Sequence, residues 1–219
     1  MVTVVIPRSQ TESQGRARVR EWVTGRWRQH HPDWAVVDAV CPTLRWSKGA
    51  AANPHLLEAS GNDVVVLADS DSYTDPRAMR NAVEAVQNGA GWAVPFTLVK
   101  RITKADTARI LAGEALPRPT IERQSRALHG GGIVVADGPT WRAVNGLDPR
   151  FTGWGGEDSC LGMALKTVAG PPHTPPPTVL WHLWHPASRR PSAHTNDLWN
   201  RYRRARRTPG GIAEIIREW

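Results

Sequence analysis

The sequence has little that would place it in a secretory or membrane environment. Its 219 residues include only two cysteines, Cys41 and Cys160, whose neighbours form no zinc-ligand pattern. Two cysteines are too few for a disulfide framework, so a reducing compartment is the simpler interpretation. No apolar run approaches the ~18 residues of a spanning helix, so we expect no stable membrane span. The N-terminus enters an apolar stretch at once and leaves no room for a signal peptide. These absences predict a cytoplasmic protein, and recruitment to a membrane surface stays open.

Internal repeats are also missing, as is any break in composition that would mark a second domain. The length fits one large domain with a proper core. Tryptophan, in contrast, is abundant: 11 are spread over the whole chain. We expect most to be core residues and a few to line a ligand site, since flat amphipathic rings serve both uses. The net charge of +8 favours an anionic partner such as a nucleic acid, a nucleotide or an acidic membrane surface.

Apolar strands alternate with amphipathic helices along the first 96 residues, which is typical of a wound α/β sheet with right-handed crossovers. Pro7 is expected to stop the first strand. The expected strands are Val2–Ile6, Trp34–Val40, Asp63–Ala68 and Trp92–Pro95. The expected helices are Arg16–Gln29, a helix capped by Ser47 that ends at Ala59, and Pro76–Gln87.

The segment Thr97–Arg126 has a different character, since it is rich in Lys, Arg, Thr and Pro and only weakly periodic. We expect one short helix there, Lys104–Ala112, inside a mobile segment. The elements expected after it are strands at Gly130–Ala136 and Val179–Leu183, a helical turn at Pro139–Val144, a stiff linker at Pro171–Pro177, and helices at Gly155–Val168 and His194–Arg207.

Two carboxylates stand at the end of the most apolar stretch. The run Val64–Ala68 indicates a buried strand and is followed by Asp69, Ser70 and Asp71. Charged groups at the edge of a core need compensation, and Mg²⁺ or Mn²⁺ bound together with substrate phosphates supplies it. Open α/β sheets also bind their ligands at the carboxyl ends of strands. We therefore expect a metal–phosphate site here, with an ordinary polar turn as the alternative.

Two further blocks carry groups that suit the same site. Glu157 and Asp158 follow a glycine-rich loop and open an expected helix. A carboxylate in that position is a reasonable general base for a hydroxyl, although helix capping explains one of the two acids. His182 and His185, three residues apart, are candidate ligands for the same ion, whereas one histidine alone is more often a core residue.

A lysine and a run of glycines complete the candidate set. Lys48 lies at an expected helix N-terminus, where it would help to hold a diphosphate; an ordinary helix start is the alternative. The run Gly130-Gly131-Gly132 is expected to let the backbone pass close beside a bound sugar, or to make a tight entry into a strand.

Taken in this order, the blocks resemble the GT-A glycosyltransferases. The similarity is greatest to family 2 enzymes with a galactosyltransferase-type C-terminal segment, such as chondroitin polymerases and polypeptide GalNAc-transferases. The blocks that carry it are Lys48–Asn53, Val66–Asp71, Gly130–Phe151 and Gly153–Asp158. The resemblance implies a GT-A fold, which is an α/β fold with a Rossmann-like mixed sheet flanked by helices.

The resemblance also implies a role for each site residue. Asp71 and His182 would bind Mn²⁺ or Mg²⁺, with Asp69 as a further ligand and His185 as the second choice of histidine. Asp158 would be the general base of an inverting reaction, and Glu157 would contact a sugar. The residues implied to bind the nucleotide sugar are Pro7, Arg8, Asp38, Lys48, Asn53, Asp69, Ser70, Gly131, Gly132, Trp154 and Gly155.

Within a single domain we expect four parts. Residues 1–96 would form the nucleotide-binding half, 97–127 a flexible acceptor or lid segment, 128–190 the acceptor and metal half, and 191–219 basic C-terminal helices. The donor is expected to be a UDP-sugar. The acceptor would be a glycan, a lipid-linked sugar, a protein or modified DNA. The abundance of Arg, Ala and Pro suggests a GC-rich genome, such as that of an actinobacterium or its phage.

Two other classes of protein stay open at this stage. A metal-dependent phosphoester hydrolase or nuclease would use the same acidic and histidine residues and the same positive charge. A non-catalytic nucleic-acid-binding module would depend on the arginine cluster Arg201–Arg207. Such a module would not need Asp71, so its function would survive Asp71→Ala, whereas a glycosyltransferase would lose most of its activity.

Overall fold

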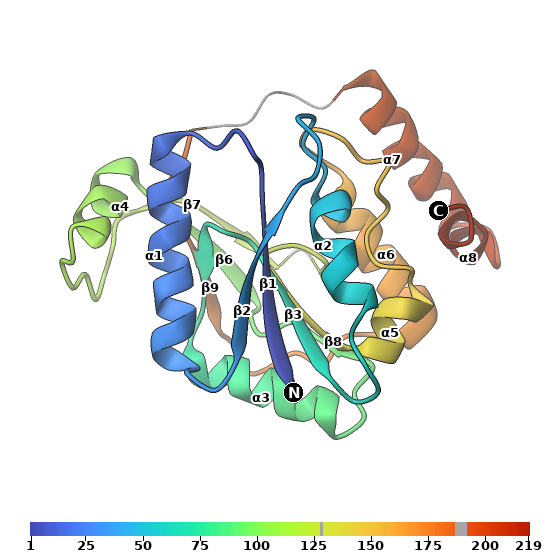
Figure 1. Ribbon diagram of the computed structural model, residues 1–219, viewed down its shortest axis with the longest axis horizontal. Coiled ribbons are helices and arrows are strands. Elements are labelled where there is room, and N and C mark those ends of the chain that lie inside the picture. The colour runs from blue at the N-terminus through green and yellow to red at the C-terminus, as the bar shows by residue number, and fades with distance from the viewer. Residues whose placement is uncertain (128, 187–191) are drawn as a thin grey trace.

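The computed structural model describes residues 1–127, 129–186 and 192–219, so the expected boundary between residues 190 and 191 lies outside the described residues. The predicted α/β fold is confirmed: helices flank two mixed sheets (Figure 1). The strands are β1 (Val2–Arg8), β2 (Ala35–Val40), β3 (Val64–Ala68), β4 (Ser72–Tyr73), β5 (Trp92–Ala93), β6 (Leu98–Ile102), β7 (Ile121–Arg126), β8 (Ile133–Asp137) and β9 (Val179–His182). The helices are α1 (Gln14–His30), α2 (Lys48–Leu57), α3 (Pro76–Gln87), α4 (Lys104–Leu111), α5 (Gly138–Ala143), α6 (Glu157–Ala169), α7 (Ala193–Ala205) and α8 (Gly211–Ile216).

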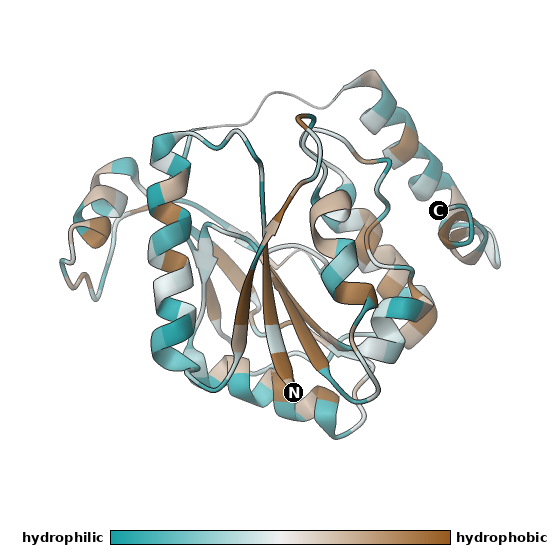
Figure 2. Ribbon diagram, viewed as in Figure 1, coloured by the Kyte–Doolittle hydropathy of each residue, from teal (hydrophilic) through white to brown (hydrophobic). Residues whose placement is uncertain are grey.

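The larger sheet has the strand order β2-β1-β3-β8-β5. Strands β1, β2 and β3 run parallel to one another, while β8 is antiparallel to both β3 and β5. Every residue of β3 is buried, which explains why its sequence is a continuous apolar run rather than an alternating one. Figure 2 shows the same contrast, with hydrophobic central strands and a largely hydrophilic α1.

Strand β1 continues through Pro7 to Arg8, so the expectation that Pro7 stops it was wrong. The pairing of β1 with β3 ends at Val5, whereas its pairing with β2 continues to Arg8. Proline has no N–H group to donate and is tolerated where a strand has a free edge. Pro7 lies in the part of β1 that has lost one neighbour, so no ladder hydrogen bond on that side is missed.

Two of the expected helix starts are confirmed by their caps. The Ser47 hydroxyl accepts a hydrogen bond from the Ala50 N–H at 3.2 Å, and Asp75 accepts one from the Arg77 N–H at 2.7 Å. Helix α6 begins differently, because its N-cap is Gly156 with φ 91° and no side chain caps it. A positive φ of this size favours glycine, so the glycines before α6 set the direction in which Glu157 and Asp158 enter the helix.

The segment 97–126 is more ordered than the sequence predicts. The expected helix is present as α4, but strands β6 and β7 flank it and pair with each other in an antiparallel hairpin. Strand β6 also pairs with β9, which pairs with β4, and these strands form the smaller sheet with order β4-β9-β6-β7. The charged residues of β6 and β7 concealed both strands, since their alternation of apolar and polar residues is weak.

Helices α7 and α8 pack against α6 at the C-terminal side of the fold (Figure 1). The buried Tyr202 hydroxyl donates a hydrogen bond to Asp148 at 3.1 Å, which ties α7 to the loop after α5. Basic helices were expected in 191–219, but no bounds were predicted for α8; it has six residues and begins at Gly211, after Pro209 and Gly210. Among the described residues, none of the helices combines the length and apolarity that crossing a membrane requires.

Candidate active site

A cleft of about 910 Å³ opens where the two sheets meet. The carboxyl ends of β1 and β3 reach it, and so does the start of β8, because β8 runs antiparallel to β3. The N-terminal ends of α2 and α6 and the inner side of β6, β7 and β9 complete its walls. Ligand sites at the carboxyl ends of parallel strands are expected for this class of sheet, and most of the predicted site residues converge here.

One group of side chains, which we call the histidine cluster, consists of Asp71, His182 and His185. The Nε2 atom of His185 lies 2.9 Å from Asp71 Oδ2, and the Nε2 atom of His182 lies 3.6 Å from Asp71 Oδ1. One candidate ligand atom from each residue lies within 4.8 Å of the other two. Residues at the end of β9 thus meet a residue from the end of β3, which is how the smaller sheet helps to build the site.

The protonation of the histidine cluster reflects burial and mutual contact. Burial by itself would raise the pKa of Asp71, but His182 and His185 outweigh it and hold that pKa well below its usual range. Burial lowers the pKa of His182. Burial also opposes the charge on His185, but its hydrogen bond to Asp71 outweighs this and raises the pKa of His185.

The donor set of the histidine cluster fits a divalent cation. Imidazole nitrogens and a carboxylate oxygen together suit first-row ions such as Mn²⁺. The second ring nitrogen of His185, Nδ1, lies 2.9 Å from the carbonyl oxygen of Pro186 and 2.8 Å from Arg16 Nη2. Arg16 can only donate, so its contact favours the tautomer with the proton on Nε2, beside Asp71. In the other tautomer Nδ1 donates to the Pro186 carbonyl and Nε2 is available to a cation, as in many metal sites.

A second group, the lysine cluster, consists of Lys48, Asp69 and Asp158. The ammonium group of Lys48 is buried and donates to Asp69 Oδ1 at 2.6 Å and to Asp158 Oδ1 at 2.8 Å. Asp69 also accepts a hydrogen bond from the Gly132 N–H at 3.1 Å. One cation therefore joins the start of α2, the end of β3 and the start of α6.

The lysine cluster has more negative than positive groups, because two carboxylates share one ammonium group. Burial would lower the pKa of Lys48, but the charges of Asp158 and Asp69 outweigh it and raise that pKa above its usual range. Burial raises the pKa of Asp69 and of Asp158, and the charge of Lys48 offsets this only in part. Removing the ammonium group would leave two partly buried carboxylates without their shared counter-charge.

Glu157 lies beside this cluster in a different environment. Its Oε2 atom is buried and has no hydrogen-bond partner among the described residues. Burial, followed by the charge of Asp158, raises the pKa of Glu157 to about 7. A carboxyl group with such a pKa is half protonated near neutral pH and can act as an acid or a base there.

The glycine run is explained by the close approach of α6. A Cβ atom on Gly131 would lie 2.7 Å from Asp158 Oδ2, so any side chain at this position would push Asp158 aside. Gly131 and Gly132 also line the cleft. The expected passage beside a bound sugar stays a prediction, while the packing beside Asp158 is what the structure shows.

The remaining predicted residues divide into two sets. Asp38 and Asn53 are not brought to the walls of the cleft. Asp38 accepts a hydrogen bond from Arg20 at 3.1 Å, and Asn53 bridges the Leu147 backbone, donating at 2.8 Å and accepting at 2.9 Å. The other predicted residues do line the cleft. In addition to the two clusters, Glu157, Gly131 and Gly132, they are Pro7, Arg8, Ser70, Trp154 and Gly155.

Several cleft residues were not predicted individually. The β6–β7 hairpin contributes Arg101 and Arg123, and the segment between β9 and the following linker contributes Trp184. The available signal was the richness of 97–126 in basic residues, which indicated ligand recognition without indicating which side chains face inward. Trp154 is the opposite case, since it was predicted and lies 56% exposed at the cleft.

Comparison with known proteins agrees with this geometry. Residues 114–166 match the family described as the N-terminal domain of galactosyltransferase. Those residues include β7, β8 and the start of α6, and therefore the glycine run and the acidic pair. No curated protein matches the chain in sequence.

One solved glycosyltransferase structure shares the fold, and two others superpose with lower scores. The structure of GalNAc-T7 with UDP, GalNAc and Mn²⁺ superposes with a TM-score of 0.57 at 11% identity, covering 93% of this chain and 47% of the other. Drosophila β1,4-galactosyltransferase 7 with xylobiose gives 0.47 at 13% identity, covering 80% of this chain and 64% of that enzyme's. A mutant of the same enzyme with manganese, UDP-Gal and xylobiose gives 0.46 at 11% identity, covering 80% and 66%.

The chain spans about half of the GalNAc-T7 structure and about two thirds of the galactosyltransferase structures. The family match and the fold shared with GalNAc-T7 confirm the predicted resemblance to the GT-A glycosyltransferases.

Proposed function

We propose that this protein transfers a sugar from a UDP-sugar to a hydroxyl group of an acceptor, with the help of a divalent cation. The observation that carries the proposal is the convergence of the histidine cluster and the lysine cluster in one cleft at the carboxyl ends of β1 and β3. A hydrolase of phosphoesters would share the first cluster, but the galactosyltransferase-type match lies on the segment that supplies the acidic pair.

Asp71, His182 and His185 would hold the cation, which is Mn²⁺ or Mg²⁺. A bound divalent ion would neutralise the charge that develops on the diphosphate leaving group. The family resemblance put His182 first and His185 second. We include both, since each has its Nε2 atom close to Asp71. Asp69, the further expected ligand, forms an ion pair with Lys48. In this proposal its role is to position Lys48 and not to bind the cation.

Asp158 would be the general base for the acceptor hydroxyl. Its burial-raised pKa makes its carboxylate more basic than an exposed one, and Lys48 fixes its orientation. Glu157, next along α6, would contact a sugar hydroxyl through its unpartnered Oε2 atom. If the base and the leaving group lie on opposite faces of the sugar, the reaction inverts the anomeric configuration.

The test is calorimetry of the wild type with UDP and with GDP, each with and without Mn²⁺, and of two variants. Asp71→Ala removes the carboxylate of the histidine cluster. Asp197→Ala, an exposed position on α7, makes the same change in charge away from the cleft. We expect UDP binding that requires the metal, that is lost in Asp71→Ala and that is kept in Asp197→Ala.

Two results would contradict the proposal. Metal-independent UDP binding that survives Asp71→Ala would remove the cation from the mechanism. No nucleotide binding, together with cleavage of a phosphodiester substrate, would favour the hydrolase. Transfer assays on Asp158→Asn and Glu157→Gln then assign the base, because loss of the base lowers turnover more than it lowers UDP affinity.

A further inference from the structure

Two arginines of the β6–β7 hairpin lie side by side on the wall of the cleft. Arg101 is directly opposite Arg123 in the antiparallel register of the two strands, and both line the cleft. Directly opposite residues of an antiparallel pair point to the same face of the sheet. Like charges in that arrangement destabilise the pairing of the strands. Arg101 is partly buried and Arg123 is exposed to the cleft, so a negatively charged ligand could reach both and relieve the repulsion.

Among the described residues no carboxylate supplies that charge. Four acidic residues of the cleft are engaged elsewhere: Asp71 with the two histidines, Asp69 and Asp158 with Lys48, and Glu12 with Arg20. Glu157 is not engaged in this way, but it forms no ion pair with Arg101 or Arg123. Glu122 also lines the cleft, but it forms no ion pair with either arginine.

Two other cations of the same unit, Lys100 and Arg109, have partners. Lys100, which alternates with Arg101 along β6, lies over the ring of Trp181 with its Nζ atom 5.6 Å from the ring centroid. Arg109 of α4 pairs with Asp106 at 3.0 Å and also with Glu114. Arg126, further along β7, also lines the cleft without an ion pair among the described residues, but the residue opposite it is Leu98. What distinguishes Arg101 and Arg123 is therefore that two unpaired cations face each other across the two strands.

The pair also lies beside the histidine cluster. In the parallel register of β6 and β9, Arg101 is the partner of His182. An anion held between the two guanidinium groups would therefore sit next to the site proposed for the divalent cation. Planar guanidinium groups bind phosphate and carboxylate with two parallel hydrogen bonds, which suits a pair that presents two forks to one ligand.

We propose that Arg101 and Arg123 form an anion-binding site for a phosphate or carboxylate group of a ligand in the cleft. The group has two possible sources, the diphosphate of the donor or an acidic substituent on the acceptor. The anion-binding site is inferred from the cross-strand pair alone. Only the identity of the molecule that supplies the anion rests on the proposed function.

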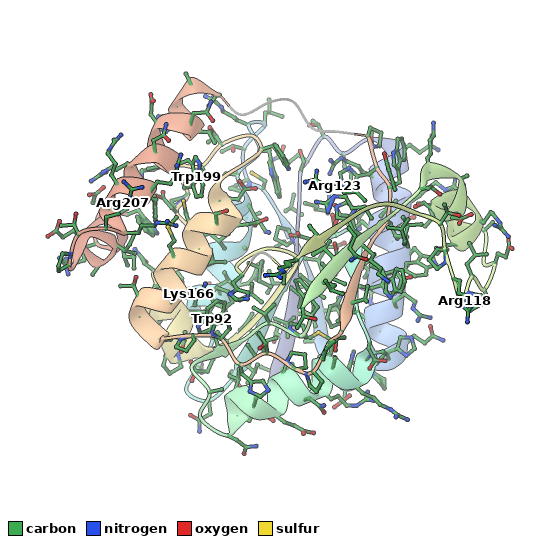
Figure 3. All side chains as sticks on the ribbon, turned by 180° about the vertical axis from the view of Figure 1, so that it is seen from behind. Trp92, Arg118, Arg123, Lys166, Trp199 and Arg207 are labelled. Carbon is green, nitrogen blue, oxygen red and sulfur yellow. The ribbon has the colours of Figure 1, made fainter. Side chains whose placement is uncertain are left out.

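The experiment compares two double variants by calorimetry. Arg101→Gln/Arg123→Gln removes the pair. Arg118→Gln/Arg207→Gln removes two exposed arginines, one in the loop between α4 and β7 and one after α7, both at the outer edges of the fold and apart from Arg123 (Figure 3). The two variants have the same net charge, so a difference between them reports on the site and not on overall electrostatics.

Two probes distinguish the sources of the anion. The first is UDP with Mg²⁺, with uridine as the control that lacks phosphate. The second is inorganic phosphate added to protein already saturated with UDP and Mg²⁺. If the donor diphosphate occupies the site, Arg101→Gln/Arg123→Gln weakens UDP binding at least tenfold and leaves uridine binding unchanged.

If an acidic acceptor group occupies the site, UDP affinity stays within a factor of two. Phosphate then binds the UDP-saturated wild type and binds the Arg101→Gln/Arg123→Gln protein at least tenfold more weakly. Equal affinities of the two double variants for both probes would overturn the inference. Phosphate binding that depends on the pair in a protein that binds no UDP would uphold the inference and refute the proposed function.

Thermal melting of each double variant shows whether lost binding comes from unfolding. Removing a like-charged cross-strand pair relieves repulsion. The melting temperature of Arg101→Gln/Arg123→Gln without ligand should therefore equal or exceed that of the control variant.

Discussion

Replacing Lys48 with methionine is expected to make the stability of this protein depend steeply on pH. Methionine keeps the length of the side chain and removes the charge that joins Asp69 to Asp158. Breaking a buried ion pair by removing one partner costs about 3–5 kcal/mol. For a domain of this size each kcal/mol lowers the melting temperature by about 2–4 °C, so the variant should melt at least ~6 °C below the wild type near pH 8.

The sign of the pH dependence follows from the two carboxyl groups. Burial already raises the pKa of Asp69 and of Asp158 in the wild type, and loss of the ammonium charge raises both further. A folded state with raised carboxyl pKa values binds protons more tightly than the unfolded state does. Its stability is therefore present at low pH and is lost as pH rises through the folded pKa.

The assay is thermal unfolding of both proteins at about pH 5 and about pH 8. The deficit of Lys48→Met should be smaller at the lower pH, because the raised pKa values of Asp69 and Asp158 favour protonation there. Lys166→Met, at an exposed position on α6, is the control (Figure 3) and should stay within about 0.5 kcal/mol of the wild type. A deficit that is the same at both pH values, or no larger than that of Lys166→Met, would refute the role given to the lysine cluster.

Three further predictions concern the same cleft. Mn²⁺ at 100 times its dissociation constant should stabilise the protein by about 2.7 kcal/mol; differential scanning fluorimetry should show a rise in melting temperature that EDTA reverses and that Asp71→Ala abolishes. The wild type should lose stability between pH 5 and pH 8, because the pKa of Glu157 in the folded state is raised to about 7 and its ionisation there disfavours folding. Glu157→Gln should lose less stability over this range. Equal slopes of melting temperature against pH for the variant and the wild type would contradict this. Gly131→Ala should lower turnover more than it lowers stability, since its Cβ atom would meet Asp158 at 2.7 Å, while Gly15→Ala, with no atom within 4 Å, should leave turnover unchanged.

Part of the candidate site could be predicted from the sequence because local rules place its residues. An apolar run that ends in Asp69 and Asp71 predicts carboxylates at the carboxyl end of a strand, and β3 has that form. The two histidines follow the apolar residues of β9 in the same way. Spacing along each strand was enough to identify Asp71 and the two histidines as candidates, while the chemistry of their side chains and the family resemblance, not spacing, suggested that they share one ion.

The lysine cluster could not be predicted in the same way. Lys48 and Asp158 are separated by 110 positions, and no periodicity connects them. Only the packing of α2 and α6 onto the larger sheet brings them together. Asn53 shows the converse, since a polar residue within a predicted motif holds the Leu147 backbone and does not line the cleft.

Strands β6 and β7 were missed for a physical reason. A strand that lies between a core and an aqueous cleft carries polar side chains on one face, and here those side chains are long and charged. Composition alone makes such a segment resemble an irregular loop. The same basic residues that concealed the hairpin provide the anion site proposed for it.

The position of β9 has a consequence for how the molecule is made. This strand lies between β4 and β6, two strands that precede it by a long stretch of chain. During synthesis the first sheet has all its strands once β8 has emerged, but the second sheet remains divided until β9 inserts at its centre. Contacts of such high sequence separation form late and slowly, so the cation site should be one of the last parts of the nascent protein to mature. A chain that stalls before β9 would have the larger sheet in place and only one of the three proposed metal ligands.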